Sequence, residues 1–150
     1  MIALDTNILV YAEHLQRAPD DTEKMARVDA IMPSVRREGL VLAAQVLAEL
    51  CNVLRRRKGL SVLASAAVIL NWRNTAIVVQ PTTMEVIESS LAIATRHGFQ
   101  TFDCIILAAA AQAGCPWLLS EDIPAGTTHG PCQVANPFLP WPPGLTAALA

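Results

Sequence analysis

Short apolar runs alternate along this chain with longer segments in which apolar residues recur every three or four positions. Each run is bounded by polar residues, glycine or proline, as is typical of buried strands, whereas the recurring spacing is typical of helices that bury one face. The runs predict strands at residues 1–4, 40–43, 76–79 and 117–119, and a last short strand at 132–135.

The helices predicted between these strands are defined with different clarity. The clearest covers residues 45–57, where apolar side chains line one face. In another helix, Pro33 predicts a kink or an early stop. Thr101 is the predicted N-cap of a strongly apolar helix. The predicted helices cover about residues 8–15, the segment from a break and possible cap at 19–22 to Gly39, 45–57, 61–73, the segment from Thr82 or Thr83 to His97, and 102–113.

Strands that alternate with helices indicate a parallel α/β sheet. Composition agrees, because 53% of the 150 residues are hydrophobic and only 5% are aromatic, which suits helices packed on a buried sheet. One domain is expected over residues 1–138. Six of the ten prolines fall between Pro124 and Pro143, so residues 139–150 are predicted to be a proline-rich tail on the surface or mobile at its end.

The formal net charge of −2 gives the chain no overall basic field, so a polyanion would have to be held by a local patch and by metal. The mean hydropathy of +0.38 predicts apolar surface that a second copy or another protein would cover. The cysteines have no close pairing and are predicted to be small core hydrophobes. No apolar run reaches about 18 residues, so we expect no membrane span and a location in the reducing cytoplasm.

Four acidic residues stand out by their positions. Asp5 ends the first predicted strand and Asp122 follows the 117–119 strand, so both fall at the carboxyl edge of the sheet, where such sheets bind ligands. Asp103 lies in the first turn of its helix, and Glu49 lies at the edge of an apolar helix face. If the four converge, their like charges require a cation, which predicts a divalent-metal site.

Each acid also has an ordinary structural explanation. The three aspartates could favour helix N-termini, where a carboxylate contributes about 0.3–1 kcal/mol, and the glutamate could be a boundary residue. One shared site is the more economical account of all four.

The sequence around these acids resembles the PIN-domain ribonucleases. Residues 2–9 (IALDTNIL) are similar to the opening of that family, and residues 48–54 (AELCNVL) resemble its second acidic motif. Residues 101–110 (TFDCIILAAA) and 118–122 (LLSED) resemble its third and fourth, and Asn-Pro-Phe at 136–138 resembles a common ending of its VapC-type toxins.

The resemblance implies a three-layer α/β/α sandwich with a central parallel sheet of four or five strands. It also implies Mg²⁺- or Mn²⁺-dependent cleavage of RNA, usually by the toxin of a toxin–antitoxin pair, with a homodimer and an antitoxin as partners. Hard oxygen ligands suit these cations, which would activate a water.

The resemblance assigns a role to each site residue. Asp5 and Asp103 would be the main metal ligands, with Glu49 and Asp122 completing the site directly or through water. Glu121 competes with Asp122 for the last place, and motif register favours Asp122. Hydrogen bonds that orient the carboxylates or water are expected from Thr6, Asn7 and Ser120.

The densest basic run, residues 55–58, offers candidate RNA contacts. Arg56, with Arg55 beside it, would lie within roughly 20° of Glu49 on the helical wheel, two turns away. The alternative is a solvated helix C-terminus favoured by the helix dipole.

Two other functions fit parts of the pattern. A PIN-like module could bind RNA or protein without cutting, although such a module has no need of four mutually repelling acids. A metal-dependent phosphatase or DNA nuclease could share the scaffold, but no Asp-x-Asp follows the first strand.

Overall fold

The computed structural model describes residues 1–15, 18–19 and 21–150. Of the predicted break and cap at 19–22, Asp20 lies outside the described residues. The first helix, predicted at about 8–15, covers Thr6–Ala12.

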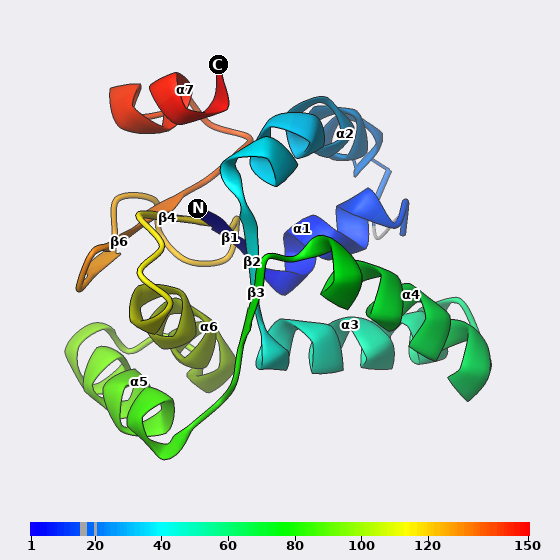
Figure 1. Ribbon diagram of the computed structural model, residues 1–150, viewed down its shortest axis with the longest axis horizontal. Coiled ribbons are helices and arrows are strands. Elements are labelled where there is room, and N and C mark those ends of the chain that lie inside the picture. The colour runs from blue at the N-terminus through cyan, green and yellow to red at the C-terminus, as the bar shows by residue number, and fades with distance from the viewer. Residues whose placement is uncertain (16–17, 20) are drawn as a thin grey trace.

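One six-stranded sheet forms the centre of the protein, in the order β3-β2-β1-β4-β6-β5 (Figure 1). Neighbouring strands are parallel except β5 and β6, which are antiparallel. The sequence predicted four or five parallel strands, so the addition is the two-residue edge strand β5. The strands are β1 (Ile2–Leu4), β2 (Leu40–Ala43), β3 (Val78–Gln80), β4 (Trp117–Leu119), β5 (Thr128–His129) and β6 (Cys132–Ala135).

Helices cover both faces of this sheet and give the expected three layers (Figure 1). Helices α5 and α6 pack together on one side, and α6 contacts β2, β3, β4 and β6. Helices α1 and α2 lie on the other side, with α3 and α4 forming a pair beside them. The helices are α1 (Thr6–Ala12), α2 (Asp21–Glu38), α3 (Ala44–Arg57), α4 (Val62–Thr75), α5 (Met84–His97), α6 (Thr101–Gln112) and α7 (Pro143–Leu149).

The strands at the centre of the sheet are mostly buried. Every residue of β1 and β2 is buried, which is why both strands are continuous apolar runs rather than alternating ones. Helix α6 is buried from Cys104 to Ala110, and its alanines let it lie close to the sheet. Three cysteines are buried, Cys51 is half-buried and all four are free thiols, which confirms their prediction as core residues.

Pro33 does not end α2 early, because the helix runs unbroken from Asp21 to Glu38. The proline is exposed, whereas Met32 and Val35 beside it are buried. Packing of that apolar face therefore outweighs the backbone hydrogen bond that a proline cannot donate.

Two boundaries differ from the prediction. Gln100, not Thr101, occupies the N-cap of α6, and its side chain makes no capping hydrogen bond. The third strand is Val78–Gln80 instead of 76–79, because α4 continues to Thr75 and Ala76 is its C-cap.

The proline-rich tail contains a helix that the sequence did not predict. Helix α7 packs against α2 and buries Leu145 and Leu149. Pro143 stands in its first turn, where a proline is tolerated. Within the described part of the chain, no helix is long and apolar enough to cross a membrane.

Candidate active site

Asp5 lies at the point where β1 ends and α1 begins. It is the N-cap of α1, and its side chain is 2% exposed. Its Oδ1 accepts a hydrogen bond from the Thr6 amide at 2.6 Å, and its Oδ2 accepts from Asn7 Nδ2 at 2.9 Å and from Ser120 Oγ at 2.6 Å. The carboxylate is therefore fixed in direction by three donors.

Burial, with smaller contributions from the negative charges of Asp103 and Asp122, raises the pKa of Asp5 to about 7. The hydrogen bonds from Ser120 and from the Thr6 amide act in the opposite direction, because they stabilise the ionised form. Asp5 thus loses its proton near neutral pH, and a cation beside it would favour that loss.

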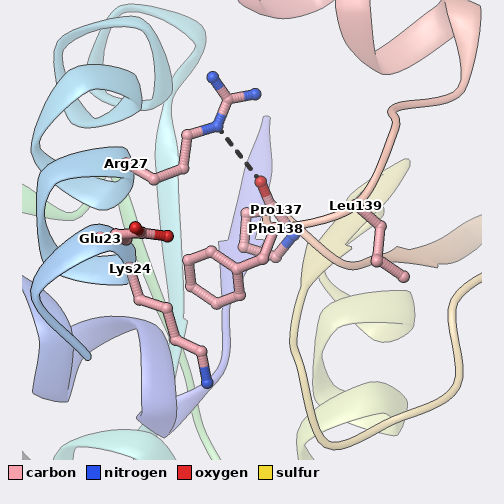
Figure 2. Close-up of a pocket in the computed structure, with 6 residues that line it drawn as sticks. All are labelled: Glu23, Lys24, Arg27, Pro137, Phe138 and Leu139. Atoms are coloured by element: carbon pink, nitrogen blue, oxygen red, sulfur yellow. Dashed lines mark hydrogen bonds between the residues drawn. The ribbon is translucent and has the colours of Figure 1, made fainter. Parts of the chain in front are cut away.

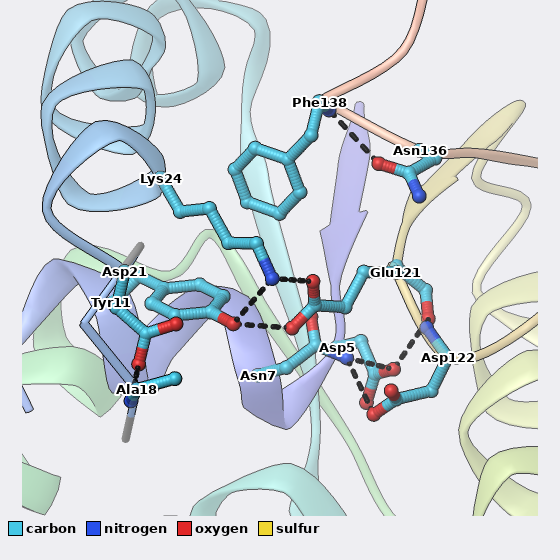
Figure 3. Close-up of polar contacts among 11 residues, drawn as sticks. Asp5, Asn7, Tyr11, Ala18, Asp21, Lys24, Glu121, Asp122, Asn136 and Phe138 are labelled. Atoms are coloured by element: carbon cyan, nitrogen blue, oxygen red, sulfur yellow. Dashed lines mark hydrogen bonds and ion pairs between the residues drawn. The ribbon is translucent and has the colours of Figure 1, made fainter. Parts of the chain in front are cut away.

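Ser120 and Asn7 connect Asp5 to Asp122. Ser120 Oγ accepts from the amides of Asp122 and Ile123 at 3.1 Å and 3.2 Å while it donates to Asp5. Asn7 Nδ2 donates to both carboxylates, at 3.0 Å in the case of Asp122 Oδ2 (Figure 3). The Asn7 Oδ1 atom is buried and has no hydrogen-bond partner among the described residues.

Glu121 points away from this cluster. Its Oε2 lies 2.8 Å from Lys24 Nζ, and its Oε1 accepts a hydrogen bond from the Tyr11 hydroxyl (Figure 3). Burial, followed by that hydrogen bond, raises the pKa of Tyr11 to about 12, and the bond to Glu121 raises the pKa of Lys24. Asp122 is therefore the neighbour that faces Asp5, as motif register suggested.

Glu49 reaches the cluster from α3. Its Oε2 accepts from Thr6 Oγ1 and its Oε1 from Gln45 Nε2, both at 2.8 Å. Gln45 lies one helical turn before Glu49, so the helix itself places the donor. The side chain is half-buried, as the predicted position at the edge of the apolar face required.

Asp103 lies in the first turn of α6 and is half-buried. Burial raises its pKa, and the charges of Asp122 and Glu49 raise it further. Within the described residues its carboxylate accepts no hydrogen bond, so its oxygens are available to a ligand.

The four acids are thus linked by charge interactions, although they come from four separate parts of the chain. The charges of Asp103 and Asp122 raise the pKa of Asp5, and the charges of Asp122 and Glu49 raise the pKa of Asp103. The described residues contain no three Asp, Glu, His or Cys side chains close enough to hold one ion. The cluster is a set of hard oxygen donors at one edge of the sheet and not a closed cage.

Two adjoining cavities lie at this edge and share Arg57 and Asp122. The first, of about 160 Å³, lies over Glu49, and the second, of about 550 Å³, lies over Glu121. Neither Arg55 nor Arg56 lines them. The first is lined by Thr6, Asn7, Val10, Glu49, Val53, Arg57 and Asp122, and the second by Tyr11, Ala18, Asp21, Lys24, Arg57, Glu121 and Asp122.

A further cavity, of about 360 Å³, lies between α2 and the segment after β6 (Figure 2). Asn136 Oδ1 accepts from the Phe138 amide at 2.9 Å, and the Phe138 ring meets the Tyr11 ring edge-on at 5.6 Å. Arg27 Nε donates to the Pro137 carbonyl at 3.3 Å. The Asn-Pro-Phe segment therefore anchors the chain over Tyr11, and of the clustered acids none lines this cavity.

Sequence reasoning missed Lys24, Gln45 and Arg57. Gln45 was detectable, because it lies four residues before Glu49 on the same helix. Arg57 belongs to the basic run that was noticed, but the helical wheel favoured Arg56 because the wheel contains no information on where the neighbouring elements lie. The contact between Lys24 and Glu121 depends on how α2 packs and has no local signal.

Comparison with known proteins agrees with this fold. A model of the PIN domain family matches residues 2–123. No curated protein matches the chain. Several solved structures do match the chain. FitAcB from Neisseria gonorrhoeae is 26% identical, with a TM-score of 0.54 over 92% of this chain and 99% of that one.

Two other solved structures share the fold at lower identity. VapC20 of Mycobacterium tuberculosis, described as a sarcin–ricin loop cleaving toxin, is 20% identical, with a TM-score of 0.60 over 79% of this chain and 87% of that one. VapBC2 of Rickettsia felis, bound to a DNA fragment from its promoter, is 17% identical, with a TM-score of 0.62 over 91% and 98%.

Proposed function

The chain belongs to the PIN domain family, and on that premise we propose that it is a Mg²⁺- or Mn²⁺-dependent endoribonuclease and the toxin of a toxin–antitoxin pair. The observation that carries the proposal is the gathering of Asp5, Glu49, Asp103 and Asp122 at one sheet edge, where the charges of neighbouring acids raise the pKa of Asp5 and of Asp103. Like charges held close together repel one another, and a bound cation would offset that repulsion.

The donor set fits such a cation. Carboxylate and amide oxygens suit Mg²⁺ or Mn²⁺, and Mg²⁺ usually keeps several waters while it binds one or two carboxylates, so an open cluster suffices. Asp5 and Asp103 would hold the ion, with Glu49 and Asp122 reaching it directly or through water. The unpartnered Asn7 Oδ1 is a buried acceptor suited to a water of the hydrated ion.

When bound, the ion would polarise a phosphate oxygen and lower the pKa of the attacking water. The protein residues position the site for that chemistry. Ser120 and Asn7 fix the Asp5 carboxylate and favour its ionised form, and Thr6 fixes Glu49. The Asp5 and Glu49 carboxylates therefore keep their direction when RNA arrives.

Cleavage assays with purified protein test this proposal. We expect RNA to be cut with Mg²⁺ or Mn²⁺ and not with a chelator, and Asp5→Asn or Asp103→Asn to lower the rate by at least about 100-fold. Glu88→Gln, at an exposed position on α5, is the matched control and should keep full activity.

The same assay separates the alternatives. Cleavage that persists in both aspartate variants would identify a contaminant, and RNA binding without turnover across several metals would identify a non-cleaving module. DNA and small phosphate esters, tested beside RNA, distinguish a ribonuclease from a DNA nuclease or a phosphatase.

We also propose an antitoxin partner that covers α4. Residues 62–70 of this helix are apolar except for Ser65, yet only Ser65 and Trp72 of the whole helix are buried, while Val62 is 64%, Leu63 82% and Leu70 58% exposed. Helices of this kind are usually covered. A solved toxin–antitoxin complex from Klebsiella pneumoniae, whose fold this chain shares at 16% identity with a TM-score of 0.63, supports a protein partner of that type. Further exposed apolar side chains, Met84, Leu91 and Phe102, support the expected homodimer.

A further inference from the structure

We propose that Arg57 and the 550 Å³ cavity beside the acidic cluster form a subsite for an RNA backbone phosphate next to the one that is cleaved. This inference rests on the proposed ribonuclease function. It assigns Arg57 to substrate binding and not to the chemical step.

The arrangement of the two cavities is the first support. A polymer whose scissile bond lies over Asp122 and Glu49 must continue beyond them on at least one side. The larger cavity opens directly from that point, because both cavities share Asp122 and Arg57. Arg57 therefore lies at the junction between the cleaved bond and the neighbouring nucleotide.

The charges that line the larger cavity are the second support. Lys24 Nζ already donates hydrogen bonds to the Glu121 carboxylate at 2.8 Å and to the Tyr11 hydroxyl at 3.3 Å. The Asp21 carboxylate accepts from the Ala18 amide at 2.7 Å. Arg57, by contrast, makes no hydrogen bond or ion pair with the described residues, although Asp122 and Glu49 are close by.

A guanidinium that has no hydrogen-bond or ion-pair partner among the described residues is available to bind a phosphate at this junction. The planar fork of donors on a guanidinium matches two phosphate oxygens. Helix-dipole stabilisation alone does not account for the position, because Arg55 and Arg56 occupy the same last turn of α3 and line neither cavity. These two arginines are therefore matched controls.

Binding of a labelled single-stranded RNA oligonucleotide to Asp103→Asn protein in Ca²⁺ tests the subsite without turnover. Against that background, Arg57→Gln should weaken binding about 5- to 10-fold and reduce the salt slope by about 0.7, the contribution of one phosphate contact. Arg55→Gln and Arg56→Gln should stay within about twofold. Arg57→Lys, which keeps the charge but loses the fork, should be intermediate.

Steady-state kinetics in the otherwise native protein give a second readout. Arg57→Gln should raise KM for RNA with kcat within about twofold, because the contact is the same in the ground state and the transition state. Equal losses for all three arginine variants would replace the subsite with a diffuse basic patch, and no loss for Arg57→Gln would remove it.

The outcome also separates the two proposals. RNA cleavage by the native protein with a normal Arg57→Gln variant overturns the subsite alone. Absence of both RNA cleavage and RNA binding overturns the ribonuclease function and the subsite together.

Discussion

At the scale of single residues, the protein keeps a carboxylate almost wholly away from water and surrounds it with donors that limit the cost. Asp5 is 2% exposed, and burial raises its pKa to about 7 from an ordinary 3.8. Because native Asp5 holds a proton at pH values where unfolded Asp5 has lost it, the free energy of unfolding should depend on pH.

Between pH 3.8 and about 7, native Asp5 is protonated while unfolded Asp5 is ionised. The unfolded state then binds fewer protons, so the free energy of unfolding of metal-free protein should fall as pH rises through this interval, by on the order of 4 kcal/mol, and level off above it. Asp5→Asn should flatten the fall. Urea unfolding in a chelator from pH 4 to pH 8 measures the free energy of unfolding of the native protein and of Asp5→Asn, with Glu88→Gln as the control. The same dependence on pH in all three proteins would contradict the account.

Ser120→Ala should act on stability and on proton affinity together. Loss of the hydroxyl leaves the Ile123 amide without its acceptor, which should lower the free energy of unfolding by about 1–3 kcal/mol. Loss of its bond to Asp5 should also raise the pH at which Mn²⁺ begins to bind. Ser90→Ala is the control, since this buried serine donates only to the Ile87 carbonyl. An unchanged pH midpoint in Ser120→Ala would mean that the hydroxyl does not tune Asp5.

The sequence located the acids but not all of their partners. The positions of Asp5, Asp103 and Asp122 were predictable because the local sequence indicates where strands end and where a helix begins. The position of Glu49 was predictable from helical spacing. Arg57 was not found, because which side of the last turn of α3 faces a cavity is decided by α1 and by the loop after β4, not by α3.

At the scale of elements, local and tertiary preferences disagree in α2, and tertiary packing decides. Pro33 in its interior cannot donate a hydrogen bond to the Asp29 carbonyl, yet the helix continues. Pro33→Ala should therefore raise the free energy of unfolding by about 1–2 kcal/mol, after allowance for the freer unfolded chain. Arg36→Ala, on the same exposed side, should change it by less than about 0.5 kcal/mol. Chemical denaturation checks this, and a destabilised Pro33→Ala would show that the proline relieves a strain elsewhere.

The elements that the sequence missed are the short ones. Strand β5 has two residues and exists through its antiparallel pairing with β6, and α7 has seven residues and exists through its contact with α2. Neither is long enough to show a period, whereas the long helices and buried strands were predictable from theirs.

At the scale of the whole molecule, the site exists because parallel strands end at a common edge. Ser120 and Asp5 are 115 residues apart in sequence and 2.6 Å apart in space, since β4 pairs directly with β1. Alternating strands and helices predicted that edge, but the pairing order that makes β1 and β4 neighbours could not be derived from spacing alone.

The exposed helix α4 makes a prediction at this scale. Leu63→Asp with Leu70→Asp should leave the free energy of unfolding nearly unchanged, because both side chains are already exposed, at 82% and 58%. The double variant should nevertheless fail to co-purify with the product of a small open reading frame next to its gene. Leu139→Asp, in the segment after β6 and 53% exposed, is the control and should retain the complex. Retention by the double variant would place the antitoxin elsewhere.

The most direct test of the shared acidic site is calorimetric titration of the metal-free protein with Mn²⁺ at pH 6 and pH 8. Binding should be tighter at pH 8, because Asp5 with a pKa of about 7 must lose its proton, and Asp103→Asn should weaken it at least about 10-fold while Glu88→Gln does not. Mn²⁺ affinity that is the same at both pH values and unaffected by Asp5→Asn and Asp103→Asn would contradict the account.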